Sequence, residues 1–195
     1  SLFRHLQGPD FLTDQRNILA MQVSGPNEQL FYLTHMLDPS KSFLQPEPSP
    51  AQVGHTFIMV MGSPDISSSL EFWRAYFSND VVGPIPYRIG VLSEAYDLPV
   101  ETQHPLALVS MVDGYGIEID QYPKEATSVP APENQRGGVI LVSLQVDPSG
   151  LKASLPWALS YKNDEGEEEG GVMILPSGTP IEVSFTEPVL PAAIE

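Results

Sequence analysis

The sequence predicts an α+β protein assembled from repeated units of one strand, one helix and three further strands. Three observations predict this class: apolar runs of strand length, one segment with helical spacing of apolar residues, and a turn-and-strand pattern that occurs three times. The length of 195 residues is ample for a hydrophobic core, and an apolar content of 42% excludes wholesale disorder.

The middle of the chain contains the clearest elements. Residues 53–61 are apolar and β-branched, which predicts a strand. Ser63, Pro64 and Asp65 then predict a helix start, with Ser63 as the capping residue and Pro64 at the first helical position. The following apolar residues recur at steps of four, three and four, as one face of a helix requires; they are Ile66, Leu70, Trp73 and Phe77.

Three strands are predicted after this helix. They cover residues 87–92, 106–112 and 117–121, and Asp113-Gly114 marks the turn between the last two. The order strand, helix and three strands defines a βαβββ unit.

One local pattern recurs along the chain: a strand, a polar turn with glycine, and a strand of the form apolar–X–apolar. Its closing strands are Phe31-Tyr32-Leu33, Ile117-Glu118-Ile119 and Ile181-Glu182-Val183. We therefore expect the back half of a first unit in residues 1–45, a complete unit in 51–124, and a divergent third unit with a weak helix in 138–188. In the third unit Val139 occupies the position that matches His55.

Composition excludes several classes of function. Nine basic against 25 acidic residues give a net charge of −16, which argues against binding to nucleic acid or to an anionic membrane surface. The chain has no cysteine, so any metal must be held by His, Asp or Glu. No spanning segment or signal peptide is expected, and the absence of cysteine fits a cytoplasmic location.

The predicted strands place one imidazole and one carboxylate on the same sheet face. Thr56, Ile58 and Val60 supply an apolar face for the helix, which sends His55 to the other face. The same alternation in residues 117–121 sends Glu118 to that face, with Asp120 beyond it. Such a pair can ligate a divalent metal, although a hydrated histidine and a solvent-facing glutamate would give the same pattern.

The order and spacing of these motifs resemble a module of the vicinal oxygen chelate superfamily, which includes glyoxalase I, type I extradiol dioxygenases and bleomycin- and fosfomycin-resistance proteins. The motifs are Gly54-His55-Thr56-Phe57-Ile58-Met59-Val60, Ser63-Pro64-Asp65, Leu70-Glu71-Phe72-Trp73 and Gly116-Ile117-Glu118-Ile119. The resemblance is close over 53–123, partial over 16–37 and weak over 138–187. It implies that modules pair, so that their mixed sheets form a cup-shaped half-barrel.

The resemblance implies a metal site with ligands from the first and last strands of a module. His55 and Glu118 match those positions, and a second histidine would complete a His/His/Glu site for Fe, Mn, Zn or Ni. The matching residue of the preceding module is Tyr32 rather than an acid, which departs from the four-ligand glyoxalase pattern. Tyr32 and Tyr115 are expected to line the cup as catalytic residues. Phe57, Met59 and Met61 are further candidates for its lining, and ordinary packing between paired sheets is an equal alternative for the two methionines.

Three other histidines are weaker candidates for the missing ligand. His35 is expected on the strand face opposite Tyr32, His5 is available only if the early chain folds back, and His104 is expected at a strand edge or in a loop. The resemblance implies that the missing histidine lies on the opening strand of the first unit, upstream of Ser1.

The resemblance implies a metal-dependent dioxygenase or lyase that acts on a small substrate with adjacent oxygens. Two alternatives stay open: a non-catalytic protein that sequesters a small molecule, as in bleomycin resistance, and a purely structural module pair. A homodimer is expected, because an odd number of modules leaves a sheet edge to cover.

Overall fold

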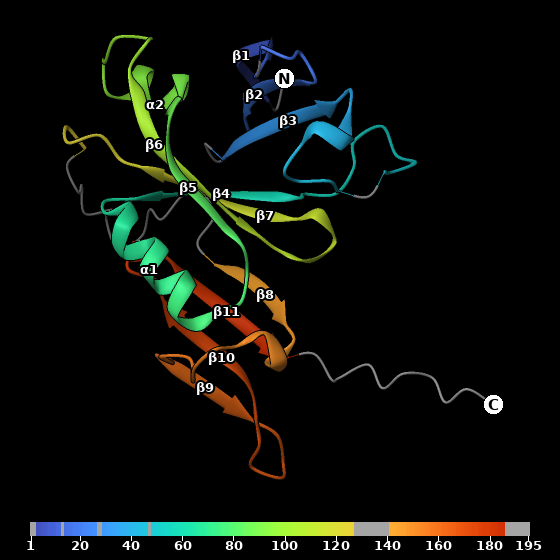
Figure 1. Cartoon of the computed structure of the whole chain (residues 1–195), viewed down its shortest axis with the longest axis vertical. Coiled ribbons are helices and arrows are strands. Elements are labelled where there is room, and N and C mark those ends of the chain that lie inside the picture. Colours follow the sequence, from blue (N-terminus) through green and yellow to red (C-terminus); the bar gives the residue numbers. More distant parts are fainter. Residues whose placement is uncertain (1–2, 13, 27–28, 47, 127–140, 186–195) are drawn as a thin grey trace. The chain divides into compact units, whose positions relative to one another are not determined.

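The computed structural model describes residues 3–12, 14–26, 29–46, 48–126 and 141–185. These residues form two α-helices and eleven strands in three sheets (Figure 1). None of the described helices is long and apolar enough to cross a membrane. The chain divides into two compact units, one with the residues up to 59 and 110–117, the other with 60–109, 118–126 and the residues from 141 on.

The first sheet is an antiparallel meander that lies in the first unit. Its order is β1-β2-β3, with bounds β1 (Arg4–Phe11), β2 (Ile18–Ser24) and β3 (Leu30–Met36). The predicted turn after β2 is closed by the amide of Gly25, which donates to the carbonyl of Gln29 at 2.7 Å. A 3₁₀ turn (Pro39–Lys41) follows β3.

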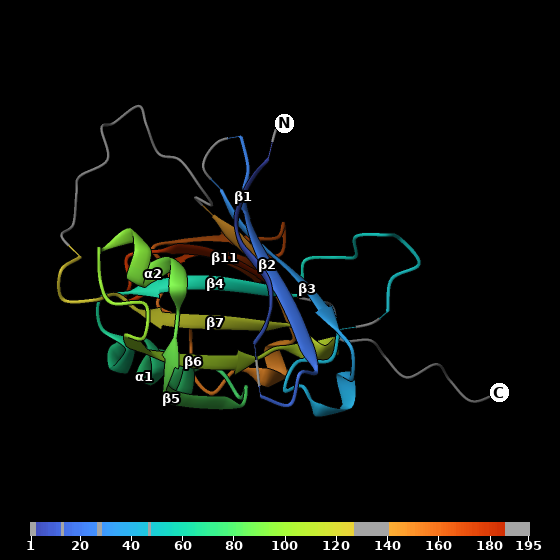
Figure 2. The ribbon, with the colours of Figure 1, turned by 90° about the horizontal axis from the view of Figure 1, so that it is seen from above.

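The second sheet has the predicted order of one strand, a helix and three strands. Its elements are β4 (Ile58–Ser63), α1 (Ile66–Tyr76), β5 (Val81–Arg88), α2 (Gly90–Ala95), β6 (Gln103–Ser110) and β7 (Gly116–Gln121). The strands are arranged in the order β4-β7-β6-β5, and Figure 2 shows them side by side. A further 3₁₀ turn (Val112–Gly114) connects β6 and β7.

This second sheet is mixed. The carbonyl of Phe57 accepts from the amide of Gly116 at 2.9 Å, and that of Ser63 accepts from Tyr122 at 2.8 Å, with the same offset along both strands. β4 and β7 therefore run parallel, whereas β5 and β6 are antiparallel. The α+β class, the mixed sheet and the βαβββ order are confirmed.

The third sheet repeats the strand order of the second without its helix. The strands β8 (Val142–Val146), β9 (Leu159–Lys162), β10 (Glu168–Ile174) and β11 (Pro180–Phe185) lie in the order β8-β11-β10-β9, with β8 parallel to β11. Between β8 and β9 the structure has only a 3₁₀ turn (Pro148–Gly150), so the weak helix predicted there is wrong. Val139, matched to His55 in sequence, lies outside the described residues.

The segment that replaces the missing helix pairs with the chain at the end of α1. The amide of Ser78 donates to the carbonyl of Gly150, and the amide of Lys152 donates to that of Tyr76, both at 2.9 Å. Phe77 and Leu151 form an isolated bridge between these bonds. The end of one helix therefore supports the entry to the third sheet.

The helix start differs from the prediction by two residues. Asp65 is the capping residue, and its Oδ1 accepts from the amides of Ser67 at 3.0 Å and Ser68 at 3.3 Å. Ser63 instead ends β4, where its hydroxyl lies 2.8 Å from that of Ser69 on α1. The predicted apolar stripe is confirmed, since Ile66, Leu70, Trp73 and Phe77 are all buried.

The hydrogen bond between the hydroxyls of Ser63 and Ser69 shows which face of β4 meets the helix. Ser63, and by alternation Met61 and Met59, point toward α1, so the prediction that Met59 and Met61 line the opposite face is wrong. By the same alternation Gly62 lies on the opposite face, where a Cβ atom on it would overlap the ring of Tyr122. The error arose because residues 57–61 are apolar in both alternating sets, so alternation carries no signal there.

Two strand predictions also need correction. β4 begins at Ile58 rather than at residue 53, which leaves residues 53–57 outside any strand. β5 ends at Arg88, and residues 90–92 of the predicted strand 87–92 belong to α2 instead.

Trp73→Ala should lower the free energy of unfolding by about 3 to 5 kcal/mol, because Trp73 is a fully buried ring on the stripe that packs α1. Urea denaturation followed by circular dichroism measures this loss. Glu71→Ala, on the exposed side of the same helix, is the matched control and should change stability by less than about 0.5 kcal/mol. Equal effects of both variants would contradict the packing described for α1.

Candidate functional site

The face of the second sheet opposite α1 carries two neighbouring carboxyl groups. Ile117 and Ile119 of β7 are buried on the helix side, so Glu118 and Asp120 project from the other face, as predicted. Figures 1 and 2 show α1 and α2 on opposite sides of this sheet. We refer to the side of α2 as the open face.

Asp120 is unusual for an acidic residue, because only 4% of its surface is exposed. Its carboxyl group is hydrogen-bonded to that of Glu118. Its Oδ1 atom is buried and accepts no hydrogen bond from any residue that the structure describes. A carboxylate in this position pays a large desolvation cost unless a proton or a cation compensates it.

The two carboxyl groups keep their protons to a much higher pH than ordinary carboxyl groups do. Burial raises the pKa of Glu118 to about 7. Burial, together with the charge and hydrogen bond of Glu118, raises the pKa of Asp120 to about 8. Because the groups interact, they titrate as a pair that shares a proton near neutral pH.

Aromatic hydroxyl groups flank this pair. Burial, and next the nearby charge of Glu118, raise the pKa of Tyr87 on β5. Burial also raises the pKa of Tyr122, which follows β7, and the neighbouring Tyr96 and Asp120 add to the effect. Both phenols therefore stay protonated at neutral pH and can donate hydrogen bonds.

α2 is anchored on the open face by a buried polar contact. The hydroxyl of Ser93 on α2 lies 3.1 Å from Nε2 of His104 on β6, and both side chains are buried. Burial lowers the pKa of His104, so the imidazole is neutral at physiological pH. His104 was predicted at a strand edge or in a loop, which is wrong, because it lies within β6 opposite Tyr87.

The other sequence-predicted residues lie in the first unit. His55 is exposed and precedes the start of β4 by three residues, so the strand alternation that paired it with Glu118 does not reach it. Tyr115 is half-buried just before β7, and Tyr32 is half-buried within β3. Within the described part of the chain, no three His, Asp or Glu side chains converge as a metal site requires.

The remaining histidines of the first unit lie on the first sheet. His35 pairs with Leu19, three positions from Tyr32 and therefore on the opposite face, as predicted. The early chain does fold back as β1, and there Nε2 of His5 lies 2.7 Å from the carbonyl oxygen of Gly8.

The third sheet repeats the apolar–acid–apolar pattern with a different outcome. Ile181 and Val183 are buried like their counterparts on β7, and Glu182 lies between them. The hydroxyl of Ser143 on β8 donates to the carboxylate of Glu182. Glu182 thus has a hydrogen-bond donor, whereas Asp120 has an unpartnered oxygen.

The buried state of Asp120 and the Ser93–His104 contact were not predicted. The sequence did contain a signal for Asp120, because Ile117-Glu118-Ile119-Asp120 alternates strictly and puts both acids on one face. Ser93 had no such signal, since its contact depends on the position of α2.

No protein-family model matches the chain, and no curated protein matches it. Among solved structures it is similar to a possible glyoxalase from Bacillus cereus, with a TM-score of 0.38 and 12% identity over 67% of this chain and 97% of the other. It is also similar to a lactoylglutathione lyase from Agrobacterium tumefaciens, with a TM-score of 0.39 and 13% identity over 70% of this chain and 96% of the other.

The carboxyl pair predicts a pH dependence of stability. The folded pKa values of Glu118 and Asp120 lie above the ordinary values of 4.5 and 3.8, so the folded chain binds more protons than the unfolded chain between about pH 4 and pH 8. The stability that this pair contributes is therefore complete below about pH 4 and is lost as the pH rises through 7 to 8.

Asp120→Asn should remove much of this loss, because an amide keeps a donor for Glu118 without a charge. In metal-free protein the variant should be more stable than the wild type by at least about 1 kcal/mol at pH 8, and by much less at pH 5. Urea denaturation at both pH values measures the difference. Glu71→Gln changes the net charge equally at an exposed position and is the control; a similar gain in that variant would contradict the prediction.

Proposed function

We propose that this chain is an enzyme of the vicinal oxygen chelate superfamily that binds a divalent metal at the open face of the second sheet. Its substrate would be a small molecule with two adjacent oxygens. The observation that carries the proposal is the pair of the half-buried Glu118 and the buried Asp120, whose Oδ1 atom is unpartnered among the described residues. The βαβββ order of the second sheet and the repeated strand order of the third also support it.

The residues of the open face fit a divalent cation of the harder type. Two carboxyl groups supply oxygen ligands, and a cation would replace the proton that they share. Among Fe, Mn, Zn and Ni, oxygen-rich sites favour Mn. The proposal includes His55 as an imidazole ligand from the segment before β4, and a paired, cup-shaped arrangement of modules with Tyr32 and Tyr115 in its lining.

A bound metal would supply Lewis-acid stabilisation of an enolate or catecholate, for lyase or isomerase chemistry, or for ring cleavage if it is Fe(II) with dioxygen. The chain itself contributes three things. Glu118 and Asp120 hold the cation, the protonated Tyr87 and Tyr122 can donate to substrate oxygens, and the burial of Asp120 keeps water from its carboxyl group.

The second candidate is a protein that sequesters a cationic small molecule without catalysis. The net charge of −16 favours it, because such a field attracts and steers cations. In either case the proposal includes a homodimer, in which sheet edges of two copies pair.

Metal content tests the proposal. Wild-type protein purified without chelators should retain a divalent metal by elemental analysis, and Mn²⁺ at a hundred times its Kd should add about 2.7 kcal/mol of stability, seen as a rise in Tm. Glu118→Gln and Asp120→Asn should lose both effects, and Glu71→Gln should keep them. His55→Ala should lower metal retention if the imidazole is a ligand.

Two results would contradict the metal site. One is wild-type protein without metal and without response to Mn²⁺. The other is full retention of metal in Glu118→Gln. A chain that fails this test but binds organic cations at Glu118 would be the sequestering protein of the second candidate.

A further inference from the structure

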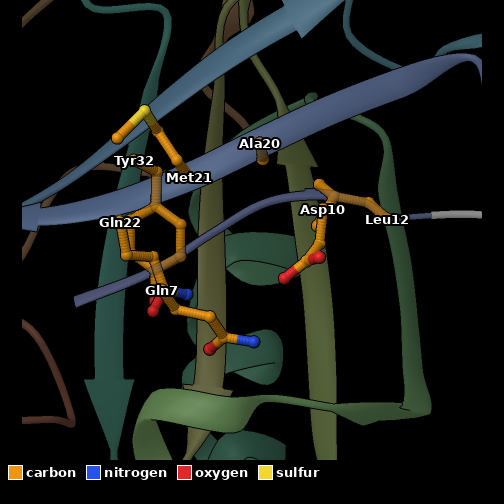
Figure 3. A pocket seen from close by; sticks show the side chains of 7 residues that line it. All are labelled: Gln7, Asp10, Leu12, Ala20, Met21, Gln22 and Tyr32. Carbon is orange, nitrogen blue, oxygen red and sulfur yellow. The ribbon is translucent and has the colours of Figure 1, made fainter. Parts of the chain in front are cut away.

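A hollow lies on one face of the first sheet, in the first unit. It is small and partly open to solvent. Its lining residues come from β1, β2, β3 and the residue that follows β1. Figure 3 shows them: Gln7, Asp10, Leu12, Ala20, Met21, Gln22 and Tyr32. All of its lining residues belong to the first unit, whereas Glu118 and Asp120 on β7 belong to the second.

The strand register places the polar lining residues on one face. Gln22 pairs with Gln7 on β1 and with Tyr32 on β3, which makes one row across the sheet. Asp10 and Ala20 form the neighbouring row on the same face. Figure 3 shows the side chains of Gln7, Gln22, Tyr32 and Asp10 extending to the same side of the ribbon, while that of Met21 extends to the other.

The shape of the hollow depends on an irregular β1 and a small residue. The pairing of β1 with β2 shifts twice, between His5 and Gln7 and between Gln7 and Asp10. Gly8 lies in this irregular stretch at φ +84°, where a Cβ atom would come within 2.6 Å of the carbonyl oxygen of Ala20, so only glycine fits. Ala20 lines the hollow with a single methyl group and is itself buried.

The lining combines the amides of two glutamines, a carboxylate, a tyrosine ring and three apolar side chains, and none of its residues is basic. Oε1 of Gln22 is buried and accepts no hydrogen bond from the described residues. Asp10 adds a carboxylate next to it, and Tyr32 adds a ring face that attracts cations. A buried acceptor without a donor is costly, and a ligand with N–H groups removes that cost.

We propose that this hollow binds a small protonated primary amine. The ammonium group donates to Oε1 of Gln22 and to the carboxylate of Asp10, and the apolar part of the ligand lies against Tyr32 and Leu12. The net charge of −16 raises the local concentration of such cations.

Titration calorimetry with three molecules of one shape tests the charge preference. The probes are 2-phenylethylammonium, the neutral 2-phenylethanol and the anionic phenylacetate. We expect saturable binding of the amine and at least about tenfold weaker binding of the other two, because a hydrogen bond to a charged donor is lost. Absence of saturable amine binding, or equal binding of the alcohol, would overturn the proposal.

Variants then test the location. Gln22→Leu and Ala20→Val should each weaken amine binding at least about tenfold, the first by removing the acceptor and the second by filling the hollow. Asp10→Asn should weaken it about threefold to fivefold, because Asp10 is exposed. Asp14→Asn removes an equal charge outside the lining and should bind like the wild type.

Two controls keep the result interpretable. Gln22→Leu removes an unpartnered polar atom, so its Tm should equal or exceed that of the wild type even as binding is lost, which separates binding from folding. Glu118→Gln should bind the amine normally, which separates this hollow from the proposed metal site. Normal amine binding in Gln22→Leu and Ala20→Val, or its loss in Glu118→Gln, would place the amine elsewhere and overturn the proposal.

Discussion

The packing of α1 against one face of the second sheet determines where the acidic side chains of β7 point. The helix stripe of Ile66, Leu70 and Trp73 needs an apolar sheet face, and Ile117 and Ile119 of β7 are buried on that side. Since side chains alternate along a strand, this burial fixes the opposite direction for Glu118 and Asp120. A shift of one residue in β7 would bury both acids under the helix. The position of the carboxyl pair is therefore a consequence of hydrophobic packing.

The elements that sequence reasoning found are those with an unambiguous period. α1 follows from helical spacing, and β7 follows from strict alternation of apolar and acidic residues. β4 was found, but its face was not, because its residues are apolar in both alternating sets. α2 and β1 lacked such a signal, since α2 has only six residues and Gly8-Pro9 interrupts the alternation in β1.

The candidate site was predictable only as far as local patterns reach. Glu118 could be placed on the correct face, but the burial of Asp120 depends on what covers that face, including α2 with its Ser93–His104 contact. Tyr32 and Glu118 occupy the same place in an apolar–X–apolar sequence, but the residues that flank them differ in burial. Phe31 and Leu33, which flank Tyr32, are 44% and 40% exposed, whereas the isoleucines that flank Glu118 are buried.

The backbone pairing between residues 76–78 and 150–152 has a consequence for how the second unit comes apart. The third sheet has no α-helix in the described part of the chain, and its entry segment is tied to the end of the helix that covers the second sheet. Fraying of the C-terminal end of α1 would break its packing on the second sheet and its backbone hydrogen bonds to residues 150–152 at the same time. The end of α1 and the entry to the third sheet are therefore expected to open together, so that their amide protons exchange with similar protection.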